Sequence, residues 1–417
     1  MIPSDIIARK RNGEELKAKD LSWFIKEYLK NDISDAQMSA LLMAIYFNGM
    51  SEIELLTLVD EMVSSGNTIE FEKSKLYLAD KHSTGGIGDK TSLVLAPVLA
   101  AAGLRIPMIA GRGLEYTGGT IDKLEAIPGI NISPSLREFK SWVNNIGCAI
   151  ISQSKEICPA DNKIYTLRNQ TATVPSIPII ASSIMSKKIA EGISGLVMDI
   201  KIGNGAFMKT KNQAIELSNL IRTIADSYKI NIDIIFSDMN QPLGRYAGLG
   251  CEIMEAVECL KGNGPQDLMS NVFELCSCLL VQSGKAKNKE KAKIIFDSII
   301  ESGNGFEIFQ KMVSSQNGLL DQLGKKIIPK FEKIVRSSKS GTINQMNTEK
   351  IGWSLVELGC SYKKENDYLD YSAGIEFFVK PGDEIIEGRP IYRLFNSNMN
   401  RLNSSIAMLT DTVTIDV

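Results

Sequence analysis

Residues 76–102 read LYLADKHSTGGIGDKTSLVLAPVLAAA, and this stretch carries the pattern that decides the fold. The apolar run at residues 76–79 is typical of a buried strand, and the run from Leu93 to Ala102 is typical of a buried helix. A loop with three glycines separates the two runs. Strand, glycine loop and helix in this order predict one unit of a parallel sheet that is covered by helices.

The same alternation continues along the middle of the chain, where short apolar runs end in glycine or polar residues. We expect further buried strands at Ile106–Ala110, Cys148–Ser152, Leu196–Ile200 and Ile230–Phe236. Helical stretches lie between these runs. The fold class predicted from this alternation is α/β with a mostly parallel central sheet.

The N-terminal part is predicted to be entirely helical. Residues 34–37 (SDAQ) and 51–54 (SEIE) both fit a capping box, in which the serine caps an early amide and the residue three positions later reaches back. Residues 179–189 predict another helix that could join this group. We expect three domains: a small helical domain of residues 1–66 plus about 155–190, a large α/β domain of residues 70–154 plus about 191–335, and an α+β appendage of residues 336–417.

Composition excludes several classes of protein. With 47 basic and 49 acidic side chains the net charge is −2, so the chain lacks the overall basic charge that is typical of nucleic-acid-binding proteins. The single histidine, His82, excludes metal sites that need two or three imidazoles. The seven cysteines are scattered without a CxxC pair and are expected to be buried, reduced thiols. No apolar run is long enough for a signal peptide or a membrane span, so we expect a soluble cytoplasmic protein with no membrane partner.

Residues 81–92 (KHSTGGIGDKTS) combine the groups of a phosphate-binding loop. The glycines let backbone amides approach an anion, Lys81 adds charge, and Ser83 and Ser92 add hydroxyl donors near a helix N-terminus. The loop is not a Walker A motif, because Asp89 interrupts the Gly-Lys-Ser/Thr run that this motif requires. A tight turn without a ligand is the alternative interpretation.

Two further segments carry polar groups. Residues 111–125 (GRGLEYTGGTIDKLE) form a second glycine-rich loop after a predicted strand, and two such loops would meet where open α/β sheets bind ligands. Ser183 and Lys187 lie four apart on a predicted helix and share a face. A solvated helix end is the alternative for Lys187, and a surface position is the alternative for Arg168.

These segments, in this order, resemble the thymidine phosphorylase and pyrimidine-nucleoside phosphorylase family. The resemblance is carried by residues 81–89, 112–125, 159–188, 203–210 and 237–244, and it extends from residues 37–45 to residues 380–383. It implies a pentosyltransferase that works as a homodimer through its helical domain. The implied reaction is the reversible phosphorolysis of a pyrimidine nucleoside to the free base and (deoxy)ribose 1-phosphate, with inorganic phosphate as co-substrate and no organic cofactor.

The resemblance also assigns roles by matching residues. The phosphate ligands would be Lys81, Ser83, Ser92 and Thr120. The catalytic groups would be His82, Arg168 and Lys187, of which Arg168 and Lys187, together with Ser183, would hold the base edge while His82 lies near O2. The apolar base pocket would consist of Leu114, Tyr165, Ile180, Ile184 and Phe207. A monovalent-cation region would lie at Gly88, Leu243 and Glu255, where the ammonium of Lys90 could substitute for potassium.

Substrate preference and departures from the family leave alternatives open. Met108 stands where the broader pyrimidine branch usually has lysine, which favours thymidine and deoxyuridine over uridine. Relatives usually differ at Ala110, Glu115, Tyr116 and Asn169. The alternatives are a broad-specificity phosphorylase that also uses uridine, a phosphoribosyltransferase-type enzyme of the same architecture, and a substrate-binding paralogue with an altered site.

Overall fold

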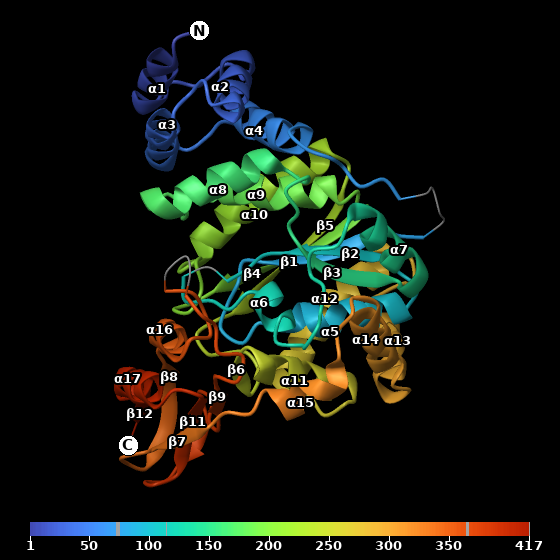
Figure 1. Cartoon of the computed structure of the whole chain (residues 1–417), viewed down its shortest axis with the longest axis vertical. Helices are drawn as coiled ribbons and strands as arrows, with labels where there is room; N and C mark the ends of the chain where they lie inside the picture. Colours follow the sequence, from blue (N-terminus) through green and yellow to red (C-terminus); the bar gives the residue numbers. More distant parts are fainter. Residues whose placement is uncertain (72–75, 114, 364–366, 417) are drawn as a thin grey trace. The chain divides into compact units, whose positions relative to one another are not determined.

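The computed structural model describes residues 1–71, 76–113, 115–363 and 367–416 (Figure 1). The chain divides into two compact units. The helical unit comprises residues 1–75, 153–196 and 211–232, and the α/β unit comprises residues 76–152, 197–210 and 233–417. Residues 211–232 therefore cluster with the helical unit, whereas the sequence prediction placed them in the α/β domain. The C-terminal residues cluster with the α/β unit rather than forming a unit of their own.

The helical unit is built around one apolar core. Both predicted capping boxes are confirmed, at Ser34 and Ser51. Phe24, Met62 and Ile179 come from distant segments of the chain and are fully buried in the same cluster. The helices of this unit are α1 (Pro3–Arg11), α2 (Ala18–Lys30), α3 (Asp35–Asn48), α4 (Glu52–Ser64), α8 (Pro159–Thr171), α9 (Ile177–Ala190) and α10 (Lys211–Ser227).

The predicted α/β fold class is confirmed. One sheet has the strand order β1-β4-β5, made of β1 (Ala79–Ser83), β4 (Gly195–Ile202) and β5 (Asn231–Asp238). Strands β2 (Ile106–Ala110) and β3 (Cys148–Ser152) pair in parallel, with the bounds that the sequence predicted. The prediction of a buried strand at residues 230–236 was partly wrong, because β5 ends the strand order and keeps half-exposed side chains.

Strand β1 differs from its prediction in a way that matters for the site. The strand begins at Ala79 instead of residue 76, and it continues through Lys81 and His82 to Ser83. The charged side chains hid this continuation from the apolar pattern, because Lys81 is buried beside the carboxylate of Asp89. Three of the predicted site residues therefore lie on a strand and not in a loop.

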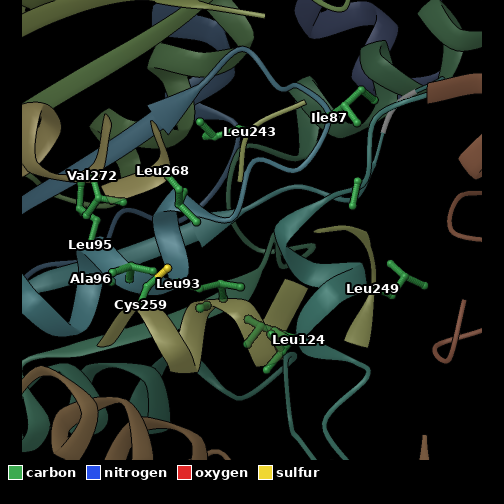
Figure 2. Close-up of a cluster of buried hydrophobic side chains, with 14 of the residues drawn as sticks. Ile87, Leu93, Leu95, Ala96, Leu124, Leu243, Leu249, Cys259, Leu268 and Val272 are labelled. Atoms are coloured by element: carbon green, nitrogen blue, oxygen red, sulfur yellow. The ribbon is translucent and has the colours of Figure 1, made fainter. Parts of the chain in front are cut away.

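Helices pack around these strands in a continuous apolar core. Leu93, Leu95, Leu124, Cys259 and Val272 belong to this core (Figure 2). All seven cysteines lie in the described part of the chain and carry free thiols, with Cys251 and Cys278 half-buried and the other five buried as predicted. The helices of this part are α5 (Thr91–Ala101), α6 (Thr120–Leu124), α7 (Leu136–Ile146), α11 (Gly250–Leu260), α12 (Gln266–Gln282), α13 (Lys289–Glu301), α14 (Asn304–Ser315) and α15 (Leu323–Lys326), with a short 3-10 turn at Leu320–Gln322.

The C-terminal residues form antiparallel sheets with two helices, and β6 joins one of these sheets from an earlier part of the chain. A four-stranded sheet has the order β6-β9-β11-β7, and a three-stranded sheet has the order β10-β8-β12. The elements are β6 (Tyr246–Gly248), β7 (Phe331–Arg336), β8 (Gly341–Met346), α16 (Thr348–Leu358), β9 (Gly374–Phe377), β10 (Glu384–Ile385), β11 (Pro390–Asn396), α17 (Met399–Leu409) and β12 (Val413–Asp416). In the ranges that the structure describes, no helix combines the length and apolar character that a membrane span requires.

Candidate active site

Lys81 lies on β1 and contacts the other end of the predicted phosphate-binding segment, residues 81–92. Its Nζ donates to Thr91 Oγ1 at 2.6 Å and to Ser92 Oγ at 3.4 Å, and it lies 3.6 Å from Asp89 Oδ1. Thr91 and Ser92 are the first two residues of α5, so the ammonium lies at a helix N-terminus, where backbone amides favour an anion. The structure thus brings together two of the predicted phosphate ligands, Lys81 and Ser92.

The loop between β1 and α5 depends on glycine. Gly85 and Gly88 have φ values of +87° and +75°, in the left-handed region that glycine adopts without strain. Ser83 Oγ accepts a hydrogen bond from Gly85 N at 3.1 Å. A Cβ atom at Gly88 would lie 2.3 Å from the carbonyl oxygen of Leu243, so no other residue fits there without moving the backbone.

The carboxylate of Asp89, in this loop, lies among buried lysines. Burial alone would raise the pKa of Asp89, but Lys81, Lys201 and Lys123 outweigh burial and hold this pKa well below its ordinary value. Lys123 Nζ also donates to the carbonyl oxygen of Asp89 at 2.7 Å. Burial lowers the pKa of Lys81, and Asp89 opposes this shift. The carboxylate therefore stays charged and helps to keep Lys81 cationic.

The second glycine-rich loop is organised by Asp122. This carboxylate accepts from Gly113 N at 2.6 Å, from Gly119 N at 3.2 Å and from Arg112 Nη1 at 2.9 Å. Thr120, a predicted phosphate ligand, is the first residue of α6 and is half-buried. Asp122 was not predicted as a functional residue, although it lies in the glycine-rich segment of residues 111–125. Leu114, predicted for the base pocket, lies outside the described residues.

His82 and Phe207 also lie in the α/β unit. His82 is half-buried on β1, next to Lys81. Phe207 comes close to the phosphate loop, since a Cβ atom at Gly85 would lie 3.8 Å from Phe207 Cε2. The structure therefore places a predicted base-pocket residue beside Gly85 of the predicted phosphate loop.

Lys187 and Ser183 lie in the helical unit and are in contact as their spacing predicted. Lys187 Nζ donates to Ser183 Oγ at 3.0 Å and to Asp161 Oδ2 at 2.5 Å. The lysine side chain is 15% exposed and the aspartate side chain 2% exposed, so Lys187 is not a solvated helix end. Asp161 lies in the quoted stretch of residues 159–188, but its role as the counterion was missed because it comes from a different helix.

Arg168 is buried as well, and the surface alternative for it was wrong. It is 1% exposed, and its guanidinium donates to the carbonyl oxygens of Thr173 and Val174. Burial lowers its pKa, whereas Asp161 and Tyr165 oppose this change. The remaining predicted pocket residues of this unit are the half-buried Tyr165 and Ile180 and the buried Ile184.

The predicted cation region contains the ammonium of Lys90. Lys90 Nζ donates to Glu255 Oε2 at 2.5 Å, to Tyr246 O at 2.8 Å and to Leu243 O at 3.1 Å. Burial would lower the pKa of Lys90, but Glu255 and Glu252 outweigh burial and raise it. Across the described ranges, no group of three or more His, Cys, Asp or Glu side chains is arranged to hold a metal ion.

The departures noted in the sequence differ in their surroundings. Tyr116 is buried, whereas Glu115 and Asn169 are exposed and Ala110 is half-buried at the end of β2. Glu115 adopts a φ of +52°, which is uncommon for a residue with a side chain. Its backbone carbonyl accepts a hydrogen bond from Ser361 Oγ at 3.2 Å.

Three parts of the chain match models of known protein families. Residues 4–66 match the helical bundle domain and residues 75–306 the a/b domain of a glycosyl transferase family. Residues 342–416 match the pyrimidine nucleoside phosphorylase C-terminal domain. The fold also resembles that of an anthranilate phosphoribosyltransferase from Thermus thermophilus, with a TM-score of 0.61 at 15% identity over 75% of this chain and 100% of that one.

Two relatives are similar over nearly their whole length. A pyrimidine-nucleoside phosphorylase from Staphylococcus haemolyticus is 40% identical over 414 residues, and one from Staphylococcus aureus is 41% identical over 414 residues. Both alignments cover 99% of this chain and 95% of the relative. The chain belongs to the pyrimidine-nucleoside phosphorylase family.

Proposed function

We propose that the chain catalyses the reversible phosphorolysis of pyrimidine nucleosides, with thymidine and deoxyuridine as preferred substrates. The observation that carries this proposal is the contact of the buried Lys81 ammonium with Thr91 and Ser92 at the start of α5. A cation, hydroxyl groups and a helix N-terminus at one point are suited to a phosphate ion. The products would be the free base and 2-deoxyribose 1-phosphate.

The phosphate side supplies the nucleophile. A phosphate oxygen forms the new bond to C1′ of the sugar while the bond from C1′ to N1 of the base breaks, and the electron pair of that bond leaves with the base. Lys81, Ser83, Ser92 and Thr120 hold the phosphate in this role. Fixing the nucleophile in line with the breaking bond removes much of the entropic part of the barrier.

The base side stabilises the leaving group. Negative charge develops on the departing pyrimidine, and the cations of Arg168 and Lys187 lie at its edge together with Ser183. Each preorganised donor of this kind contributes about 3 kcal/mol to lowering the barrier. Asp161 fixes the position of the Lys187 ammonium at 2.5 Å. His82 donates to O2 of the base or supplies the proton that the base takes up.

Met108 favours a 2′-deoxy sugar. It lies on β2, is 1% exposed, and its thioether offers no donor to a ribose hydroxyl. A hydroxyl without a partner in a closed site costs binding free energy, so uridine would react more slowly than thymidine.

Lys90 takes the place of a bound potassium ion. Its ammonium has two carbonyl oxygens and one carboxylate oxygen within 3.1 Å, a donor set that also suits a monovalent cation. The enzyme then needs neither potassium nor an organic cofactor. Activity that stays unchanged when sodium replaces potassium supports this role, and strong activation by potassium contradicts it.

The helical unit supplies the surface of a homodimer. Met43, Tyr46 and Phe47 on α3 are 37%, 42% and 77% exposed, and their spacing places them on one face of the helix. Ile53 on α4 is 55% exposed. Large apolar side chains at helical spacing are typical of an interface. Phe47→Glu should convert the dimer to a monomer in light scattering coupled to size-exclusion chromatography, whereas Lys30→Glu should leave it dimeric.

The proposed reaction is tested by incubating the protein with thymidine, with and without phosphate, and measuring free thymine by chromatography. Thymine release that requires phosphate is the expected result. A substrate-binding paralogue would release no base from thymidine, deoxyuridine or uridine. A broad-specificity phosphorylase would release uracil from uridine as fast as thymine from thymidine.

A further inference from the structure

Tyr116 is a buried aromatic residue that the proposed reaction does not use. It lies in the loop before α6 and is 4% exposed. Its phenol donates to the carbonyl oxygen of Ala206 at 3.4 Å and accepts from Lys209 Nζ at the same distance. The phenol thus contacts residues on both sides of Phe207.

The ring of Tyr116 packs against two other aromatic rings. It stacks on Phe207, with the ring centroids 6.0 Å apart and the planes at 25°, and it packs against Trp353 of α16 at 5.6 Å. A Cβ atom at Gly352 would lie 2.6 Å from Tyr116 Cδ2, so α16 approaches the ring as closely as a glycine permits. These contacts leave the ring little freedom to turn.

The segment that carries Phe207 is anchored by polar contacts as well. Lys209 Nζ lies 2.6 Å from Glu349 Oε2 and donates to Asn204 O at 2.8 Å. Asn204 Oδ1 accepts from Thr348 N at 2.7 Å, at the start of α16. The side chains of Asn204 and Lys209 therefore anchor this segment to α16 on both sides of Phe207.

We propose that Tyr116 is a positioning residue for nucleoside recognition, which holds the Phe207 ring in the orientation that packs against the pyrimidine. This inference rests on the proposed function, because it takes Phe207 as part of the base pocket. The terminal torsion of a phenylalanine ring has broad wells, so its orientation needs a neighbouring group to fix it. Tyr116 supplies that neighbour on the ring face that it stacks against.

Steady-state kinetics of Tyr116→Leu and Tyr116→Phe test this role. Tyr116→Leu removes the stacked ring and should raise the KM for thymidine about five- to tenfold, the factor that an aromatic pair contributes, while kcat and the KM for phosphate change less than about twofold. Tyr116→Phe keeps the ring and should retain the wild-type KM. In a double-mutant cycle, Phe207→Leu should raise the KM for thymidine only slightly further when Tyr116→Leu is already present.

Phe273→Leu is the matched control. It breaks another aromatic pair of the same unit, between Phe273 and Phe296 at 5.5 Å, and should lower the melting temperature without changing the KM for thymidine. If Tyr116→Leu does not fold, Trp353→Leu is measured instead, because the Trp353 ring is 41% exposed and packs against Tyr116 at 5.6 Å. A raised KM for thymidine in Trp353→Leu then supports the inference, and an unchanged KM overturns it.

The remaining outcomes separate the inference from the proposed function. Suppose that the wild type releases thymine but the folded Tyr116→Leu variant keeps its KM for thymidine; the inference is then wrong and the phosphorylase function stands. The same holds if the effects of Tyr116→Leu and Phe207→Leu on the KM for thymidine are additive. If the wild type releases no base from any pyrimidine nucleoside, the proposed function is wrong and the inference falls with it.

Discussion

Lys187 Nζ lies 2.5 Å from Asp161 Oδ2, although the two residues belong to different helices, α9 and α8. The carboxylate is almost completely buried, so it holds the ammonium in a medium where charge interactions are strong. Lys187 also donates to Ser183. These two contacts fix the position of the Lys187 ammonium, the group that the proposed reaction places at the departing pyrimidine.

Removing the cation should slow the reaction strongly. Lys187→Ala is expected to lower kcat about 100-fold or more, because one preorganised donor to the developing negative charge is lost. The exposed pair of Lys30 with Glu27 offers a control, and Lys30→Ala should keep wild-type turnover. Initial rates of thymine release at saturating thymidine and phosphate measure the effect. Wild-type turnover in Lys187→Ala would show that the residue does not stabilise the leaving base.

Removing the counterion should have a smaller effect of the same kind. Asp161→Asn leaves Lys187 charged but without its ionic partner, so we expect kcat to fall about tenfold, as is typical when a supporting residue is changed. Circular dichroism should show a folded protein. A kcat equal to that of the wild type would mean that Ser183 alone positions the ammonium.

Loss of Lys81 should weaken phosphate binding selectively. Lys81→Met removes the charge that lies against Thr91 and Ser92, and the KM for phosphate should rise about tenfold or more. The affinity for thymine, measured by calorimetry, should change less than about twofold, because the base-edge residues are untouched. An unchanged KM for phosphate would show that Lys81 does not bind phosphate.

Lys90 offers a test by substitution with threonine, which supplies an oxygen ligand in place of the ammonium. Lys90→Met leaves the buried Glu255 carboxylate without its ionic partner and should destabilise the fold by about 3 to 5 kcal/mol, the usual cost of breaking a buried ion pair. Lys90→Thr should regain part of that stability when potassium is added, and the wild type should not respond to potassium. Melting curves in potassium and in sodium measure both effects. Equal responses of wild type and Lys90→Thr would contradict the substitution of ammonium for potassium.

The pH dependence of stability should reveal the buried charge of Asp89. Its pKa in the folded protein lies well below the ordinary value of 3.8, since three lysines outweigh the effect of burial. A lowered pKa stabilises the fold fully above the ordinary value, and the contribution is lost as pH falls through the folded pKa. In urea titrations the difference between wild type and Asp89→Asn should therefore be constant near neutrality and shrink only below about pH 4. A difference that already shrinks well above about pH 5 would contradict this.

The sequence predicted those features that depend on neighbours along the chain. Strands β2 and β3 begin and end as expected because their apolar runs coincide with the paired residues. The contact of Ser183 with Lys187 follows from helical spacing. Lys81 and Ser92 could be assigned to one site because strand, loop and helix follow each other directly.

Features that depend on tertiary contacts could not be predicted in this way. The extension of β1 through Lys81 was missed because only the buried ion pair with Asp89 makes a lysine acceptable there. The partner of Lys187 lies in another helix, and the packing of Tyr116 depends on Trp353, which is far along the chain. Spacing in the sequence carries no information about such pairs.

Phosphorus NMR of the protein with thymidine and inorganic phosphate tests the central claim most directly. Phosphorolysis predicts a new phosphomonoester signal from 2-deoxyribose 1-phosphate, which grows in equal amount to free thymine while the phosphate signal declines. Thymine that forms without this signal, or no thymine at all, would contradict the assignment of the residue 81–92 loop as the site that delivers phosphate to the sugar.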